Sequence, residues 1–393
     1  MDREDFVELQ QALGITHHPR ALLLDRSLDV LLSPVKVYMH DWMHALYVDG
    51  VVNLHVYLLF EAFIGKGLKN VYETFSDYAA KWKWPGRLHG NHLAEIFSAA
   101  RRKSHRDASH IKCQASDLLS LTPVLAHFVQ TVLLPCHVCD AECLSFLALA
   151  DIVEIILSTS RNQVRPEMLL ARVHRFLQNF VDAFGYNAQT PKFHWLLHLP
   201  ECLLRFGLLL NCFVLERKHR TAKRYATDIT NTSKNPSKSL LAEVLCHQFG
   251  MLLDPQAFNF EVGLVGGRKA PKAARKLILE ALGEAENTGH IILVAKESRF
   301  NQHGTCMTGD VVLVKEGGSF RAGRVKLHCS IEGEAVTFVN CWQLVSHEPG
   351  QGYAVWEQSD TADLLFTSDI VDTVPYMTLP NGHVGTLLPI DYR

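Results

Sequence analysis

The stretch MLLARVHRFLQNFVDAFG, at residues 168–185, decides the fold class of the central part of the chain. Its apolar residues recur at spacings of three and four, which is the period of an amphipathic helix. The stretch DLLSLTPVLAHFVQTVLLP, at 117–135, repeats this pattern. Residues 42–250 are therefore predicted to be mostly helical, divided into helices of ordinary length by the prolines at 85, 123, 135, 166, 191 and 200.

The pattern changes after residue 289. Short segments such as HIILVAK (290–296) and AVTFVNCWQLV (335–345) alternate with glycine-containing turns, which indicates β-strands. Several short strands close together are typical of a small barrel or sandwich. We predict a β-rich domain at 290–393, preceded at 251–289 by a linker and one helix.

Composition limits the function classes. The chain has 393 residues, of which 48% are apolar, enough for two or three folded domains. Its formal charge of −2 leaves no global signature of nucleic-acid binding, so any DNA contact requires a local basic face. The polar start and ten scattered cysteines predict an intracellular protein without a signal peptide. The longest apolar runs are interrupted and too short to span a bilayer, so no membrane segment is expected.

Two separated pairs of side chains are candidate metal ligands. Asp41 and His44 lie in HDWMHALYVDG, and His194 and His198 lie in PKFHWLLHLPE. Spacings of three and four place the members of each pair on one face of a helix. Together they would complete a four-ligand zinc site, which would be structural because no coordination position stays open. Alternatively, Asp41 is a helix N-cap beside an ordinary histidine, and the second pair arises by chance among 21 histidines.

The segment LERKHRTAKRYA, at 215–226, combines one carboxylate with many cations. Glu216 is a candidate catalytic ligand of a divalent metal, since phosphoryl transfer by hard cations requires carboxylates. The candidate DNA-backbone contacts around it are Arg217, Lys218, Arg220, Lys223 and Arg224. The alternative is a solvated helix in which Glu216 pairs with Arg220.

Other motifs are weaker or absent. Cys136 and Cys139 form one CxxC with no second copy, so we interpret them as ordinary thiols. The chain has no P-loop, no GxGxxG before a strand, no GxSxG and no HExxH. These absences argue against nucleotide-dependent enzymes, α/β-hydrolases and zincin proteases.

The order of the three phrases resembles eukaryotic DDE transposases of the CACTA-like (CMC) type. Typical of that family are a D-x-M-H phrase followed by Gly-Val, a K-x-H-x-L-x-H-L-P-E phrase and an E-R-x-x-K phrase. The corresponding phrases here begin at Asp41, Lys192 and Glu216, and the likeness covers roughly residues 20–250.

This resemblance implies an RNase H-like core with a large helical insertion, giving an α/β part followed by an all-β part. Residues 1–45 would be a remnant of that core, and 46–250 the insertion with the terminal catalytic helix. In the family, three carboxylates hold two Mg²⁺ ions for DNA strand cleavage and transfer. Glu216 would be the last carboxylate, with Asp25 a weaker candidate for another. A comparable ligand pair joins two later histidines on zinc in the Transib-like recombinases, which supports the four-ligand site.

Only 40 residues precede the first phrase, so we expect a chain truncated at its N-terminus, without the full triad. The leading hypothesis is a nuclear, transposon-derived DNA-binding protein with structural Zn²⁺, and with Mg²⁺ only where catalysis survives; homo-oligomerisation stays open. One alternative is a zinc-dependent hydrolase using Asp41, His44, His194 and His198, although no general base is evident. Another is a non-catalytic nuclear interaction protein.

Overall fold

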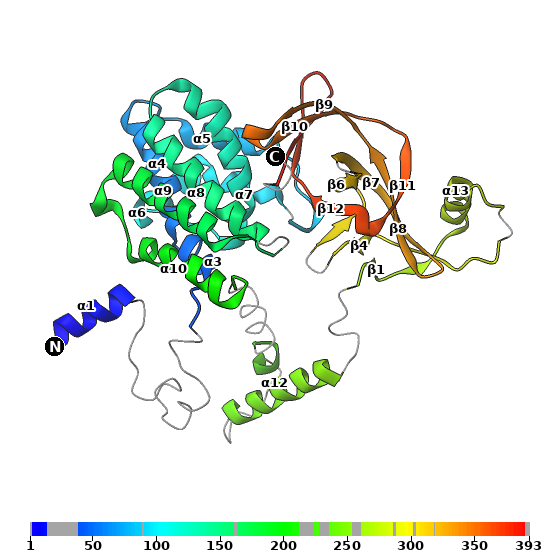
Figure 1. The fold of residues 1–393 in the computed structure, drawn as a ribbon, viewed down its shortest axis with the longest axis horizontal. Coiled ribbons are helices and arrows are strands. Elements are labelled where there is room, and N and C mark those ends of the chain that lie inside the picture. The colour runs from blue at the N-terminus through cyan, green and yellow to red at the C-terminus, as the bar shows by residue number, and fades with distance from the viewer. Residues whose placement is uncertain are drawn as a thin grey trace. The chain divides into compact units, whose positions relative to one another are not determined.

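The computed structural model describes residues 2–13, 38–88, 90–160, 164–211, 223–227, 236–253, 261–285, 288–301, 304–317 and 319–389. A helical N-terminal region is followed by antiparallel β-sheets (Figure 1). The chain divides into two compact units. We call Met1–Phe75 with Ile96–Val214 the helical unit, and Ser76–Glu95 with Leu215–Arg393 the β unit.

The predicted, mostly helical region is confirmed in its described residues. Pro123 and Pro200 were wrongly predicted to divide helices, because they lie inside the helices at Ala115–Phe128 and Pro191–Phe206. The helix α1 (Arg3–Leu13) precedes this region. The α-helices within it are α3 (Trp42–Leu46), α4 (Val51–Gly65), α5 (Val71–Ala79), α6 (Ala99–Ala108), α7 (Ala115–Phe128), α8 (Asp140–Ser158), α9 (Pro166–Phe184), α10 (Pro191–Phe206) and α12 (Pro236–Leu253). Short 3-10 or π turns lie at Gly86–Leu88, Gly90–His92, Ala94–Phe97, Val129–Leu133, Leu134–Cys136 and Tyr186–Ala188.

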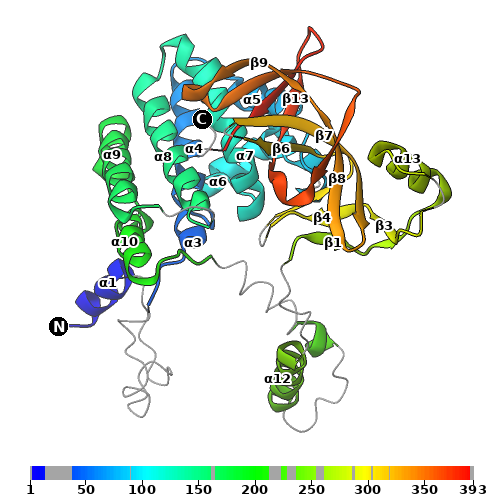
Figure 2. The same ribbon diagram turned by 45° about the vertical axis from the view of Figure 1, so that its right-hand side comes forward.

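The packing of α9 follows directly from its sequence. Pro166 starts the helix at a position where a missing N–H costs nothing, and Gly185 ends it with a φ of 79°. Its buried residues are spaced by four, three and four, so they form one stripe, which consists of Leu169, Val173, Phe176 and Phe180. Each buried phenylalanine contributes about 1.5–3 kcal/mol by leaving water. The neighbouring α8 is buried nearly all round and lies between α9 and α4 (Figure 2).

Two helical stretches, Trp42–Gly65 and Ala115–Cys136, are long and apolar enough to cross a membrane by length and composition alone. Half of each stretch is buried inside the protein, and buried core helices meet the same criterion. They are therefore weak evidence for a membrane span.

In its described residues, the β unit forms three antiparallel sheets, ordered β1-β4-β5, β13-β14-β10-β9 and β11-β8-β7-β3-β2; β6 pairs with β7 and β12. The barrel alternative is wrong, because β11 and β2 end the largest sheet without closing it. The strands are β1 (Gly263–Val265), β2 (Arg268–Lys269), β3 (Ile292–Ala295), β4 (Glu297–Arg299), β5 (Thr305–Met307), β6 (Val311–Glu316), β7 (Ser319–Ile331), β8 (Glu334–Cys341), β9 (Gln343–Glu348), β10 (Tyr353–Glu357), β11 (Ala362–Phe366), β12 (Ile370–Thr373), β13 (Tyr376–Thr378) and β14 (Val384–Leu387).

The β unit recruits residues from outside 290–393. The segment 251–289 supplies β1, β2 and the helix α13 (Lys272–Leu282), and β1 pairs with β4. A second contribution comes from residues 76–95, which interrupt the helical unit in sequence. There, the Lys83 N–H donates to the Tyr376 carbonyl at 2.7 Å, and the Gly86 N–H donates to Asp310 Oδ1 at 2.7 Å.

The expected RNase H-like remnant falls largely outside the described residues. Asp25 and the ALLLD run lie in 14–37, which the structure does not describe. Residues 3–13 form α1, and no strand precedes α3 within the described part. The remnant therefore stays a prediction.

Candidate functional site

The first phrase forms α3 and its cap. Asp41 accepts hydrogen bonds at Oδ1 from the backbone N–H groups of Met43 (2.9 Å) and His44 (3.3 Å). Its Oδ2 lies 2.9 Å from Nδ1 of His44. Asp41 is thus an N-cap, and its carboxylate is occupied by its own helix.

The second phrase forms the first half of α10. The Nε2 atoms of His194 and His198 lie 3.0 Å apart, so one imidazole donates to the other. The ring of His40, just before the cap of α3, stacks on His198 with centroids 4.7 Å apart and planes 8° apart. The structure therefore brings the two phrases together, through His40 rather than through Asp41 or His44.

Burial and the neighbouring imidazoles favour the neutral forms of His40 and His198. Burial lowers the pKa of His40 to about 4, and the neighbouring His198 and His194 add to that shift. Burial followed by repulsion from His194 also lowers the pKa of His198. A neutral imidazole has a free lone pair, which is the form that binds a metal ion.

The four predicted metal ligands do not form a single group. Across the residues that the structure describes, no three or more His, Cys, Asp or Glu side chains are placed to hold an ion. Asp41 pairs with His44, and His194 pairs with His198. The 3.0 Å separation within the second pair suits two nitrogens on one ion, since metal–nitrogen bonds are about 2.0–2.1 Å long.

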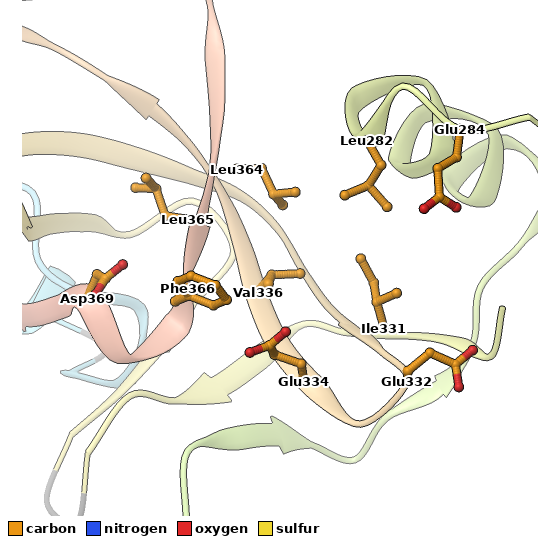
Figure 3. A pocket seen from close by; sticks show the side chains of 10 residues that line it. All are labelled: Leu282, Glu284, Ile331, Glu332, Glu334, Val336, Leu364, Leu365, Phe366 and Asp369. Carbon is orange, nitrogen blue, oxygen red and sulfur yellow. The ribbon is translucent and has the colours of Figure 1, made fainter.

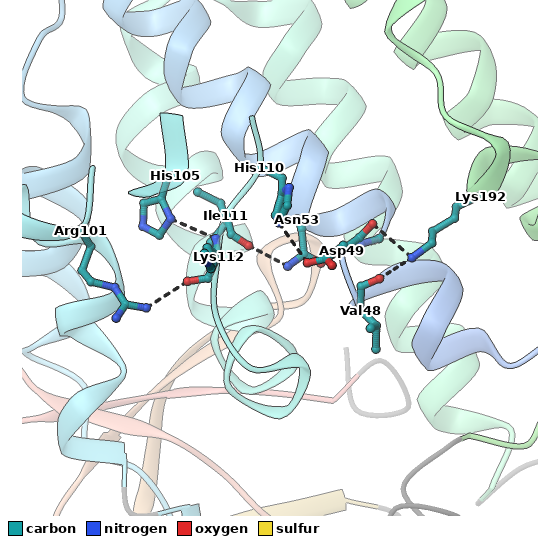
Figure 4. Close-up of polar contacts among 10 residues, drawn as sticks. Val48, Asp49, Asn53, Arg101, His105, His110, Ile111, Lys112 and Lys192 are labelled. Atoms are coloured by element: carbon teal, nitrogen blue, oxygen red, sulfur yellow. Dashed lines mark hydrogen bonds and ion pairs between the residues drawn. The ribbon is translucent and has the colours of Figure 1, made fainter. Parts of the chain in front are cut away.

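A polar clamp holds the turn between α3 and α4 (Figure 4). The ammonium of Lys192, at the start of α10, donates to the carbonyl oxygens of Val48 and, at 3.2 Å, Asp49. His110 Nε2 lies 2.9 Å from Asp49 Oδ1. Burial lowers the pKa of Lys192, although Asp49 opposes that shift. Asp49 has a φ of 46°, a left-handed conformation that these contacts hold in place.

Close packing against α3 explains why position 50 of the first phrase is a glycine. A Cβ on Gly50 would lie 2.3 Å from the backbone carbon of Leu46, so no other residue fits without moving α3. Asn53 then accepts the Gly50 N–H at 3.2 Å and donates to the Ile111 carbonyl at 2.8 Å. Sequence reasoning missed His40, Asp49 and Lys192 as site residues, although all three lie inside the quoted phrases.

Most of the third phrase lies outside the described residues, including Glu216, Arg217, Lys218 and Arg220. Lys223 and Arg224 are exposed, within a short helical segment at 223–227. Arg224 donates to the Tyr225 hydroxyl at 3.0 Å. Both cations are therefore accessible to a polyanion, and the catalytic role of Glu216 stays a prediction.

The cysteines of the described chain are free. Cys136 is exposed, whereas Cys139 and Cys143 are buried, and burial raises the pKa of Cys143 to about 12. The core of the β unit also contains a Cys–His pair that was not predicted from the sequence. Cys306 Sγ lies 3.9 Å from His328 Nε2, and His328 Nδ1 lies 2.9 Å from the Thr337 hydroxyl.

This buried Cys–His pair is unreactive. Both side chains are fully buried, and burial raises the pKa of Cys306 to about 12 and lowers that of His328 to about 4. A nucleophilic cysteine requires the opposite shift toward thiolate. The pair therefore belongs to a core polar network, which ends at the hydroxyl of Thr367.

Comparison of the chain with protein-family models, with curated proteins and with solved structures finds no match.

Proposed function

We propose that the chain is a transposon-derived, nuclear DNA-binding protein related to the CACTA-like DDE transposases. The proposal starts from three phrases that occur in the family's order at Asp41, Lys192 and Glu216. One structural observation supports it most: the first two phrases, far apart in sequence, touch through the stacked rings of His40 and His198.

DNA binding is assigned to the basic side chains of the third phrase. Lys223 and Arg224 are exposed. Because cations that neutralise DNA phosphates release counterions on binding, the affinity for DNA falls as the salt concentration rises. The test is fluorescence anisotropy of a labelled DNA duplex between about 50 and 200 mM salt. Replacing Lys223 and Arg224 by Gln should lower the slope of log K against log salt by roughly 1–2.

The matched control replaces Arg172 and Arg175 of α9, which pair with Asp151, by Gln. Binding with an unchanged salt slope in the Lys223/Arg224 variant rules out this assignment. Absence of any duplex binding by the wild type rules out the DNA-binding function itself.

Strand cleavage is tested separately with Mg²⁺ or Mn²⁺ on wild type and Glu216→Ala. Glu216 is the carboxylate that the resemblance carries over, and Asp25 is the weaker second candidate. Cleavage lost in the variant supports a metal-binding role for Glu216. No cleavage by either protein refutes catalysis by this chain while leaving DNA binding intact.

Zinc is proposed as a structural ion bound by His194 and His198, with Asp41 and His44 as the further ligands. Those two side chains hydrogen-bond each other, so joining the ion requires that they separate. Elemental analysis of the purified protein checks this. A zinc content near zero, or one unchanged by combined His194→Ala and His198→Ala, excludes the four-ligand site. No described contact favours the zinc-hydrolase alternative.

A further inference from the structure

A hollow of about 470 Å³ opens on one face of the largest sheet in the β unit (Figure 3). Its wall comes from the end of α13, the turn between β7 and β8, and β11. The β unit alone supplies all of its lining residues.

The strand register explains why the floor of this hollow is apolar. Phe366 lies opposite Val336, and Leu364 lies opposite Phe338, so these four side chains share one face of the sheet. Ile331 lies two residues beyond Cys329, which pairs with Val336, and therefore joins the same face.

The helix α13 covers only part of that face. Its Ile278 and Leu279 pack against Val336 and Phe338, and the helix then stops at Gly283 in a left-handed cap. Beyond this stop the face is open, and Phe366 remains 51% exposed. An aromatic side chain left uncovered above an apolar hollow is typical of a binding surface.

The rim of the hollow is uniformly acidic. Its charged members are Glu284, Glu332, Glu334 and Asp369, and none of its ten lining residues is Lys or Arg. His290 contacts two of these carboxylates, Glu284 at 2.7 Å and Glu332 at 3.2 Å. The hydrogen bond from the Ile291 N–H lowers the pKa of Glu332, and the hydrogen bond with His290 lowers it further, so this carboxylate stays ionised.

Glu332 lies at a sterically unfavourable backbone position. Glu332 has a φ of 51° and Gly333 a φ of 93° in the tight turn between β7 and β8. Asn or Gly is the usual residue at the first of these positions. The Glu332 carboxylate accepts the Ile291 N–H at 2.9 Å, which fixes its position at the rim.

The outer edge of β11 offers main-chain hydrogen-bonding groups. β11 ends the order β11-β8-β7-β3-β2, and no described strand pairs with its other side. Extended peptides bind such edges as an added strand, with every second side chain turned toward one face. The acidic rim repels nucleic-acid phosphates and favours lysine and arginine.

We propose that this hollow binds an extended, lysine- or arginine-rich segment of a partner protein. One apolar side chain of the segment contacts Phe366 and Val336, and its cations pair with the glutamates of the rim. This interaction is independent of the DNA-binding function proposed above.

The test uses the full chain and a fluorescein-labelled peptide, GSKSLSKSG, whose Leu and two Lys side chains share one face of an extended strand; binding is measured by anisotropy titration. Two matched peptides are GSESLSESG, with reversed charge, and GSKSSSKSG, without an apolar side chain. We expect GSKSLSKSG to bind most tightly. Phe366→Ala should weaken it about tenfold, as for loss of a central aromatic contact. Glu334→Lys should weaken it about fivefold or more by placing a cation on the rim.

Two control variants change similar exposed side chains elsewhere in the β unit. Leu344→Ala is on β9, where Leu344 is 49% exposed, and Glu357→Lys is on β10. Both should bind the peptide as the wild type does. The melting temperature of every variant is measured to separate a folding defect in Phe366→Ala from a loss of binding, and Glu334→Lys gives a second, surface-only probe.

Several results would overturn the proposal. They are equal binding of the acidic peptide, no binding of GSKSLSKSG, or wild-type affinity in both Phe366→Ala and Glu334→Lys. Binding of a DNA duplex that weakens in Phe366→Ala would instead assign this surface to nucleic acid. None of these outcomes bears on DNA binding through Lys223 and Arg224.

Discussion

Lys192 donates a hydrogen bond of 3.2 Å to the backbone carbonyl oxygen of Asp49, which precedes it by 143 residues. The same ammonium also donates to the Val48 carbonyl. We expect Lys192→Met to lower the free energy of unfolding by about 1–3 kcal/mol, because these bonds to a charged donor are lost. Urea unfolding measures this change.

The matched control for this change is Lys103→Met, at an exposed position on α6. It should change the free energy of unfolding by no more than about 0.5 kcal/mol. Equal stability of Lys192→Met and wild type would show that the clamp contributes nothing to folding.

His55 makes the stability of the helical unit depend on pH. It is fully buried, lies 2.9 Å from the Ser145 hydroxyl and is surrounded by phenylalanines of α8 and α9. Burial lowers its pKa to about 3, whereas an unfolded histidine titrates near about 6.5. The unfolded state therefore binds a proton first as pH falls, and stability is lost progressively from about pH 6.5 toward pH 3.

From His55 alone, this loss amounts to about 2 kcal/mol between pH 7 and pH 5. Urea unfolding at the two pH values, on wild type and His55→Leu, isolates the contribution. The variant should be less stable at pH 7 but should show a smaller fall toward pH 5. Identical pH dependence in the two proteins would mean that His55 is not buried in its neutral form.

Gly323 in β7 is required by close packing against β8. A Cβ there would lie 2.6 Å from the Asn340 carbonyl oxygen and 3.0 Å from the Cys341 Cα, both backbone atoms. Gly323→Ala should destabilise the β unit by about 1–3 kcal/mol, as overpacking does. Gly263→Ala is the control, because no atom lies within 4 Å of its Cβ position. Calorimetry should show a lower melting temperature for Gly323→Ala alone.

The thiols should differ sharply in reactivity. Cys306 and Cys329 are fully buried, and burial raises the pKa of each to about 12, whereas Cys136 and Cys246 are exposed. Since the thiolate is the reactive form, iodoacetamide at mildly alkaline pH should label the exposed pair first. Peptide mass spectrometry after a short labelling pulse checks this. Labelling of Cys306 as fast as Cys136 in the folded protein would contradict its burial.

Much of the helical unit was predictable because helix periodicity is local. The apolar spacing in 168–185 predicted α9, and four of the residues that carry it are buried. Asp41 was recognised as a possible cap, and it caps α3 through two backbone N–H groups. Both results depend only on backbone geometry within a few turns of helix.

The candidate site was predictable in its parts but not in its contacts. The sequence pointed to the phrases at Asp41 and Lys192, and the structure brings these phrases into contact, but the rings that meet are those of His40 and His198. Which side chains face each other depends on how α3 packs against α10. That packing is a non-local property, and short sequence spacings carry no information about it.

By itself, the sequence determined the helical and strand-rich regions and offered Asp41 as the cap of α3. Tertiary structure alone decided that residues 76–95 join the β unit, that Lys192 clamps Asp49, and that α13 leaves an acidic hollow uncovered. The physical reason is the range of the interactions. Backbone period and capping act over a few residues, whereas packing chooses among apolar faces that are distant in the chain.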